Sequence, residues 1–368
     1  MKLRFPFARF KKEMHERPSC ETGGGTPRII IHAGFGKCGS SSIQAALVQN
    51  FFQLQRDGFS LFGRDLRIAH EPGNLGPPMW ALQRAAEQGQ GLAQRLSDEV
   101  VSLANRNRKQ IGILSAENLQ EPQMAKLFAG IDRHLEVSLV FYLRPQLEWI
   151  PSAWKQWSLK RGLSLSDFVS DCLRTRTPSF KLSIDTWKSV LPAAQIHIRF
   201  LIPEMLIGGN PAQDFFYLAG LPLNNYDMGK EHRNPSLDFS IVHVLSKNPH
   251  LFSSIHDVEL MERLAGILSE RFRSINIQML SREEEARIEE FFRDENLWLL
   301  NTYCSGMDVD RIYRAYFLPR ETEVRYSDVA EIDLIYRCLG IILKLIATNR
   351  DEMVAEDGKL RPPPKQKR

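Results

Sequence analysis

The sequence predicts an α/β protein in which a parallel sheet is flanked by helices and followed by a mostly helical C-terminal region. Short apolar or β-branched runs alternate with helical patterns as far as about residue 235, which is typical of strands joined by helical crossovers. One run, 137–143, is apolar on both faces, as a central parallel strand is. After Asn234 no further strand pattern occurs.

The strands are expected, in chain order, at 29–32, 59–62, 110–115, 137–143 and 196–201. Between them, helical periodicity predicts helices at 41–55 and 81–105, and Gly58 would end the first of these. A capping box, Ser281-Arg-Glu-Glu284, predicts a helix that starts at residue 281. Ligands of open parallel sheets bind at the carboxyl ends of the strands, so the residues that follow each strand are the candidate site.

The composition bounds the class of protein. The chain has 368 residues, of which 43% are hydrophobic and 25% charged, and a formal net charge of +4. This mild positive charge suits an anionic ligand without indicating nucleic acid. No apolar run reaches the roughly 18 residues that a membrane span needs. The five cysteines are scattered without metal-ligand spacing, which favours a reducing compartment, and we expect a cytoplasmic protein without a metal site.

The ends of the chain differ in composition from its middle. Residues 1–26 lack the apolar core of a secretory signal and end in a glycine run, so they are expected to form a flexible tail. Residues 351–368 are rich in proline and basic residues and are expected to form a second tail. The intervening segment, 27–350, is expected to be one α/β domain with its helical part starting at about 235.

The residues after the first strand predict an anion-binding loop. A glycine-rich turn carries Lys37, and three serines then begin a helix. Backbone N–H groups and a helix N-terminus in this order cradle phosphate. When Gly34 and Gly39 are aligned with the glycines of a Walker A loop, Ser40 stands where the lysine belongs. The fourth strand ends in Arg144 instead of a metal-binding carboxylate, so a kinase or NTPase that uses ATP and Mg²⁺ is an alternative only.

The order Lys37-Cys38-Gly39-Ser40-Ser41 after a strand resembles the 5′-phosphosulfate loop of sulfotransferases that use 3′-phosphoadenosine 5′-phosphosulfate (PAPS). A second motif of this family, an arginine at a strand end and a serine eight residues on, is similar to Arg144 and Ser152. Shorter similarities follow the third and fifth strands and extend to about residue 240. The resemblance looks closest to the bacterial, carbohydrate-directed branch and implies a P-loop-like fold.

The resemblance also implies roles for these residues. Gly36 and the N–H groups from Cys38 to Ser41, which include Gly39 and Ser40, would hold the 5′-phosphosulfate, and Lys37 would meet the charge that builds on its bridging oxygen. Arg144 and Ser152 would grip the 3′-phosphate. No metal ion is required. Cys38 stands where the family usually has threonine or another small residue, and its thiol donates only weakly.

Three residues are candidates for the base that accepts the acceptor's proton. The resemblance favours a His or Glu after the second strand, where His70 and Glu71 stand, and Glu117 at the end of the third strand is the other candidate. His32 is more simply a core histidine, and Trp154 and Trp157 are more simply core residues than an adenine platform.

Two charged segments are left with open or ordinary interpretations. Lys230 and Arg233 could form a basic lip over the nucleotide or a solvated loop. Residues 283–285 are expected on a solvated helix face.

The predicted function is therefore sulfuryl transfer from PAPS to a hydroxyl or amine acceptor, a carbohydrate or glycolipid. A non-catalytic protein of the same fold that binds nucleotide or glycan is the second alternative.

Overall fold

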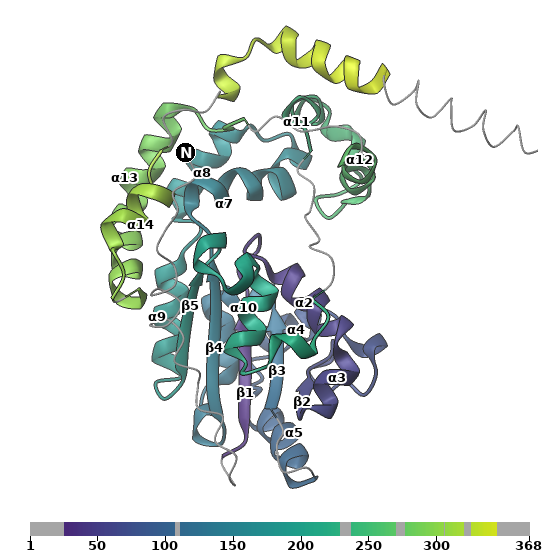
Figure 1. The fold of residues 1–368 in the computed structure, drawn as a ribbon, viewed down its shortest axis with the longest axis vertical. Coiled ribbons are helices and arrows are strands. Elements are labelled where there is room, and N and C mark those ends of the chain that lie inside the picture. The colour runs from purple at the N-terminus through teal and green to yellow at the C-terminus, as the bar shows by residue number, and fades with distance from the viewer. Residues whose placement is uncertain are drawn as a thin grey trace, which may run out of the picture. The chain divides into compact units, whose positions relative to one another are not determined.

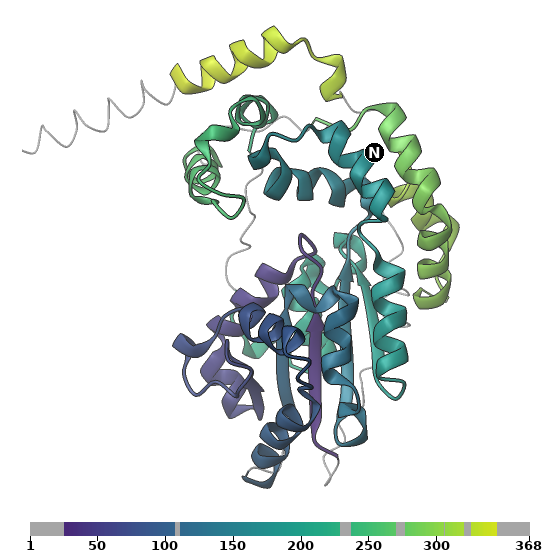
Figure 2. The same ribbon diagram turned by 180° about the vertical axis from the view of Figure 1, so that it is seen from behind.

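The computed structural model of the protein describes residues 26–106, 111–228, 237–269, 277–304, 306–319 and 325–343. The described residues contain a five-stranded sheet in which all neighbouring strands are parallel, in the order β2-β3-β1-β4-β5 (Figures 1 and 2). The strands are β1 Arg28–Ala33, β2 Phe59–Leu61, β3 Ile111–Ala116, β4 Glu136–Leu143 and β5 Gln195–Phe200. The predicted fold class and all five predicted strands are thereby confirmed, with ends that shift by one residue.

The helices before the last strand are α2 Ser40–Gln49, α3 Phe51–Arg56, α4 Met79–Glu87, α5 Ala93–Arg106, α6 Pro122–Ala125, α7 Gln146–Ala153, α8 Leu165–Thr175 and α9 Phe180–Val190. Those after it are α10 Pro211–Leu218, α11 Phe239–Lys247, α12 Glu259–Ser269, α13 Arg282–Tyr303 and α14 Val309–Tyr316, and residues 331–343 are also helical. Beyond residue 236 the described residues are helical except for loops and one isolated bridge, as the sequence predicts.

Two predicted helices are each divided in two. The helix expected at 41–55 breaks at Asn50, whose side-chain amide donates to the Ala46 carbonyl (2.8 Å) and whose Oδ1 accepts from the Asp227 N–H (2.9 Å). The helix expected at 81–105 breaks before α5, where Gly89 has a left-handed φ of 62°. In each case a backbone turn ends one helix and lets the next begin.

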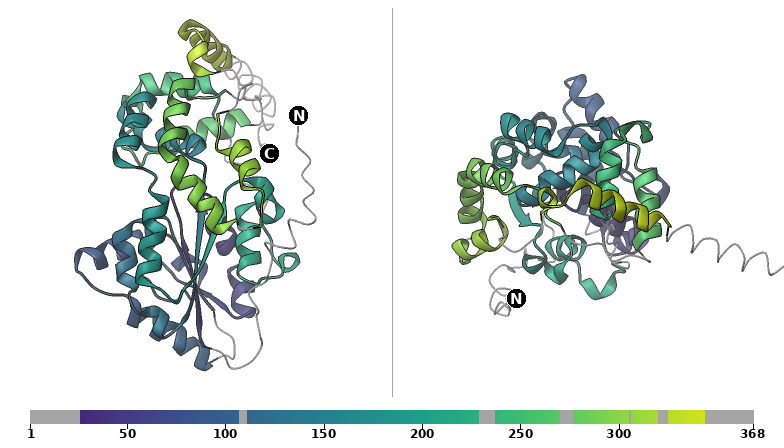
Figure 3. Two further views of the ribbon diagram at one scale, coloured as in Figure 1. Left: turned by 90° about the vertical axis from the view of Figure 1, so that its left-hand side faces the viewer. Right: turned by 90° about the horizontal axis from the view of Figure 1, so that it is seen from above.

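The strand order decides which helices cover which face. The connection from β1 to β2 runs toward one edge of the sheet, whereas the connections from β2 to β3, β3 to β4 and β4 to β5 run toward the other. Because such crossovers are right-handed, α2 and α3 lie on one face, and α5, α6 and α9 lie on the opposite face. The left panel of Figure 3 shows helices on both sides of the sheet, and α10 packs on α2. β1 is thus the strand beside which the connections leave toward opposite edges of the sheet. Open α/β sheets bind ligands at this kind of position.

The described residues fall into two compact units. Unit 1 takes its residues from 1–153, 169–233 and 285–319 and contains the sheet. Unit 2 takes its residues from 154–168, 234–284 and 320–368, and its core includes Trp154, Leu159, Val242 and Ile341. The two tails expected at 1–26 and 351–368 lie outside the described residues, apart from residue 26.

The helix start predicted at residue 281 is confirmed. The Ser281 N–H donates to Glu284 Oε2 (2.8 Å) and the Glu284 N–H donates to Ser281 Oγ (3.2 Å), which is the reciprocal capping box. The solvated face expected for 283–285 is wrong for Glu285. This side chain is fully buried, because it lies on the same helical stripe as the buried Ile288 and Phe292.

Candidate anion-binding site

The loop between β1 and α2 has the backbone of an anion cradle. Lys37 and Gly39 both have left-handed φ angles, 65° and 91°. Gly39 is the N-cap of α2 and has no side chain to accept from the first N–H groups of the helix. Such N–H groups, at the positive end of the helix dipole, bind anions. For a lysine, a left-handed φ costs on the order of 1–3 kcal/mol, so the surrounding structure must hold this turn.

Close packing explains two glycines of the loop. A Cβ on Gly34 would lie 2.5 Å from Ser40 Oγ and 3.4 Å from the Glu117 Cα, and a Cβ on Gly39 would lie 3.0 Å from Pro211 Cγ. The loop therefore approaches the end of β3 on one side and the start of α10 on the other.

The sheet register brings the ends of β3 and β4 to the two sides of this loop. Ala33 pairs with Ala116, and the Gly34 N–H donates to the Ala116 carbonyl (2.9 Å), so Glu117 lies beside the loop. β4 pairs with β1 on the other side, and Arg144 follows it. The three predicted charged residues thus come from the carboxyl ends of three adjacent strands.

The charges of these residues act on one another. Burial lowers the pKa of the Lys37 ammonium, the carboxylate of Glu117 opposes this, and the guanidinium of Arg144 lowers the pKa further. Burial raises the pKa of Glu117, and Lys37 opposes this shift. Two cations and one carboxylate therefore share a partly buried site at the carboxyl edge of the sheet, an arrangement that favours an anionic ligand.

Arg144 has a side chain that an anion could recruit. Its Nε lies 3.3 Å from Glu148 Oε2, and the two side chains are 29% and 40% exposed. Ion pairs this exposed contribute only about 0–1 kcal/mol, so a phosphate could replace Glu148 as the partner at small cost.

The remaining loop residues differ in exposure. Cys38 is fully buried, and burial raises the pKa of its thiol to about 12. Ser40 is buried, with its Oγ 3.5 Å from the Phe35 carbonyl oxygen, whereas Ser41 is exposed in the first turn of α2. Gly36 is buried and its carbonyl accepts a hydrogen bond. The Cys38 N–H, one of the predicted donors to the ligand, already donates within the loop to the Phe35 carbonyl (3.1 Å).

The other candidates come from two further segments of the chain. His70 and Glu71 are exposed in the segment after the edge strand β2, and Ser152 is partly buried in the second turn of α7. Of the three base candidates, Glu117 is the one whose charge acts on Lys37. Lys230 and Arg233, the proposed basic lip, lie outside the described residues.

Two residues that the sequence favoured as core residues are buried. Burial lowers the pKa of His32 to about 3, and its Nδ1 is paired with Ser115 Oγ at 2.8 Å. Trp154 is 4% exposed in the core of unit 2, and its indole donates to the Leu163 carbonyl (2.8 Å). Trp157 is partly buried. His32 and Trp154 are thus core residues, as expected.

Sequence reasoning missed one residue that contacts the loop. The Trp149 indole, on α7, donates to the Gly36 carbonyl (2.8 Å), across 113 residues of sequence. Trp149 stands five residues after Arg144, and this position is the one signal in the sequence that could have indicated its contact with the loop. A helix that follows a site residue tends to pack beside the site.

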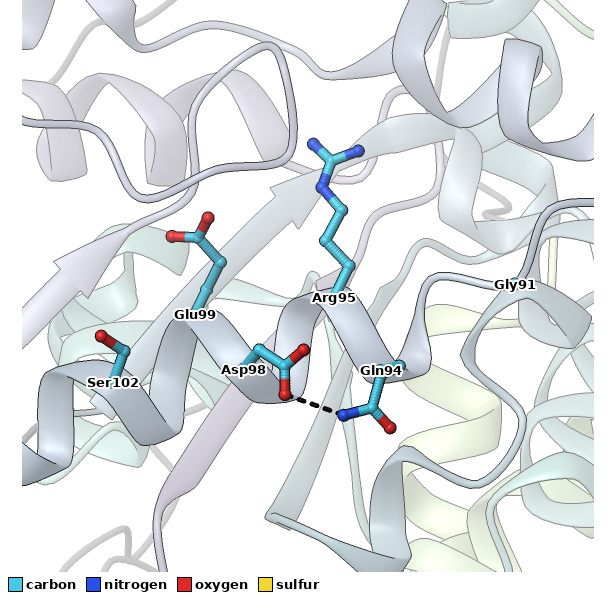
Figure 4. Close-up of a pocket in the computed structure, with 6 residues that line it drawn as sticks. All are labelled: Gly91, Gln94, Arg95, Asp98, Glu99 and Ser102. Atoms are coloured by element: carbon cyan, nitrogen blue, oxygen red, sulfur yellow. Dashed lines mark hydrogen bonds between the residues drawn. The ribbon is translucent and has the colours of Figure 1, made fainter.

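A hollow on unit 1 is lined by residues other than those of the candidate anion-binding site. Figure 4 shows it on α5 and the preceding turn, lined by Gly91, Gln94, Arg95, Asp98, Glu99 and Ser102. None of these residues belongs to the loop after β1 or to the ends of β3 and β4. Among the described residues, no group of three or more His, Cys, Asp or Glu could hold a metal ion, and no helix has the length and apolarity of a bilayer span.

Comparisons with known proteins show a likeness to a solved structure. A solved sulfotransferase from Alicyclobacillus acidocaldarius matches with a TM-score of 0.40 and 13% identity, over 78% of this chain and 99% of that chain. No protein-family model matches the chain, and no curated protein matches it significantly. At this TM-score the likeness carries no weight for function, which depends on the residues of the site.

Proposed function

We propose that this site binds PAPS and transfers its sulfuryl group to a hydroxyl or amine of a carbohydrate or glycolipid acceptor. One observation carries the proposal. Lys37 and Arg144 follow adjacent strands, and their charges act on each other beside the N-terminus of α2. A nucleotide with anionic groups at its 5′ and 3′ positions is the kind of ligand that needs two such cations.

The proposed step is an in-line displacement at sulfur. The acceptor oxygen forms a bond to sulfur while the bond from sulfur to the bridging oxygen breaks, which leaves adenosine 3′,5′-bisphosphate. Lys37 stabilises the negative charge on that oxygen, and the N–H groups of the loop hold the 5′-phosphate. Glu117 accepts the proton of the acceptor, since its charge acts on Lys37 and burial raises its pKa toward the working pH. His70 and Glu71 are the alternative bases.

Ligand-dependent melting tests the proposal against the kinase or NTPase alternative. We expect adenosine 3′,5′-bisphosphate without metal to raise Tm. At a concentration about 100 times its Kd the gain is about 2.7 kcal/mol, which corresponds to several degrees. ATP with Mg²⁺ should raise Tm much less, because ATP lacks the 3′-phosphate for Arg144. Stabilisation by ATP with Mg²⁺ alone would support the kinase or NTPase instead.

The rate is expected to depend on pH as a narrow bell. Glu117 must be ionised, and its raised pKa moves the rise in kcat/KM above the pH of an ordinary glutamate. Lys37 must be protonated, and its lowered pKa moves the fall below the pH of an ordinary lysine. A pH series of kcat/KM measures both limbs. Lys37→Arg should move the alkaline limb to higher pH, and Glu117→Gln should remove the acid limb; an acid limb that persists in Glu117→Gln would point to His70 or Glu71.

The acceptor is best found without assuming its identity. Candidate glycans and glycolipids are incubated with PAPS and the protein, and mass spectrometry detects any that gain a sulfate. We expect hydroxyl-bearing carbohydrates among the products. A wild-type protein that binds the bisphosphate but sulfates no member of a broad panel would favour the non-catalytic alternative.

A further inference from the structure

The segment that follows β4 holds the phosphate loop at two points. The indole of Trp149 donates to the Gly36 carbonyl at 2.8 Å. The backbone N–H of Arg144 donates a hydrogen bond to the sulfur of Cys38. Trp149 is 4% exposed and Cys38 is fully buried, so water cannot easily replace either partner. These two contacts lie on either side of Lys37.

The conformation of the loop makes such support necessary. Lys37 has a φ of 65°, a region that residues other than glycine adopt only when their surroundings impose it. The Gly36 carbonyl precedes the N–H of Lys37 in the same peptide group. When the indole holds that carbonyl, the opposite N–H has a fixed direction, and the carbonyl dipole is kept away from an anion in the loop.

Arg144 is the first residue of the segment that follows β4, and Trp149 stands five residues later in the same segment. A movement of α7 that displaces Arg144 therefore also displaces the donor on Gly36. We propose that Trp149 is a positioning residue that fixes the Gly36–Lys37 peptide and couples the phosphate loop to the site of Arg144. Occupation of either anion site then favours the arrangement that the other requires. This inference rests on the proposed function, because it assumes a ligand that occupies both sites.

Removing the indole N–H while keeping an aromatic ring tests the coupling. Trp149→Phe is compared with Trp154→Phe, a matched control that removes an equally buried indole whose donor bond, to the Leu163 carbonyl, is also 2.8 Å long. Calorimetry measures Kd for adenosine 3′,5′-bisphosphate and for adenosine 5′-monophosphate. In Trp149→Phe we expect the bisphosphate affinity to fall about 5- to 10-fold, the effect of one buried hydrogen bond on a charged site. The control should remain within about twofold of wild type.

The ratio of the two dissociation constants separates coupling from general destabilisation. In wild type the bisphosphate should bind more tightly than the monophosphate, because it carries the 3′-phosphate. The ratio of the monophosphate Kd to the bisphosphate Kd should be smaller in Trp149→Phe than in wild type, and unchanged in Trp154→Phe. In the transfer assay Trp149→Phe should lower kcat more than it raises KM for PAPS, because Lys37 acts on charge that develops during the reaction. If Trp149→Phe does not fold, benzothienylalanine at position 149 keeps the bicyclic shape and removes only the donor.

The outcomes distinguish the inference from the proposed function. A wild type that does not bind the bisphosphate overturns the proposed function and the coupling with it. A wild type that binds, together with a Trp149→Phe or benzothienylalanine variant of unchanged ratio and kcat, overturns the coupling alone. Equal losses in Trp149→Phe and Trp154→Phe would also overturn it, since they would reflect core packing.

Discussion

Lys37→Ala is expected to lower kcat for sulfuryl transfer by about 10²- to 10³-fold, the usual cost of removing one group that stabilises charge in a transition state. Lys37 is partly buried, and the carboxylate of Glu117 and the guanidinium of Arg144 act on its ammonium. In such a site the interaction with a developing charge is stronger than in water. Steady-state assays with saturating PAPS measure the loss in kcat.

A control and a binding measurement make this result specific. Lys188→Ala removes an exposed lysine on α9 and should leave kcat unchanged. The affinity of Lys37→Ala for adenosine 3′,5′-bisphosphate should fall by a much smaller factor than kcat, because under the proposed function the loop backbone and Arg144 would still bind the phosphates. Transfer at the wild-type rate by Lys37→Ala would remove the lysine from the mechanism. If the wild type and Lys37→Ala are both inactive on every acceptor, the result would favour a non-catalytic role.

The parts of the fold that the sequence predicted are those set by local patterns. The run 137–143 is apolar on both faces because helices cover both faces of the sheet and bury β4, so the position of this strand could be predicted directly from the sequence. The capping box at Ser281 is likewise a local signal. The meeting of Lys37, Glu117 and Arg144 could be anticipated because the carboxyl ends of parallel strands share one edge.

The parts that could not be predicted depend on contacts distant in sequence. Pairing across the whole sheet decides that β3 and β4 are the two neighbours of β1. Asn50 ends a helix because Asp227, 177 residues away, accepts from and donates to its side chain. The bond from Trp149 to Gly36 spans 113 residues. No local pattern in the sequence encodes these pairs, so the support of the loop emerged only from the structure.

Loss of the buried ion pair between Arg199 of β5 and Asp214 of α10 should have the largest effect on the stability of the protein. Asp214, on α10, is fully buried and accepts hydrogen bonds from Arg199, from the Tyr142 hydroxyl (2.8 Å) and from the Ile207 N–H (2.9 Å). Asp214→Ala leaves the guanidinium of Arg199, 5% exposed, without its counter-charge. Such a loss costs about 3–5 kcal/mol, a large part of the roughly 5–15 kcal/mol that stabilises a typical native protein. Urea denaturation should show this as a lower midpoint.

The loss should also reach the anion-binding site, because α10 packs on α2 and a Cβ on Gly39 would lie 3.0 Å from Pro211, the first residue of α10. Affinity for adenosine 3′,5′-bisphosphate should therefore fall in Asp214→Ala even well below its unfolding temperature. Asp171→Ala is the control: it breaks an exposed pair with Arg174 and should change stability by less than about 1 kcal/mol. If Asp214→Ala proves as stable as Asp171→Ala, the carboxylate does not hold α10 against the sheet, and the support of Gly39 must come from packing alone.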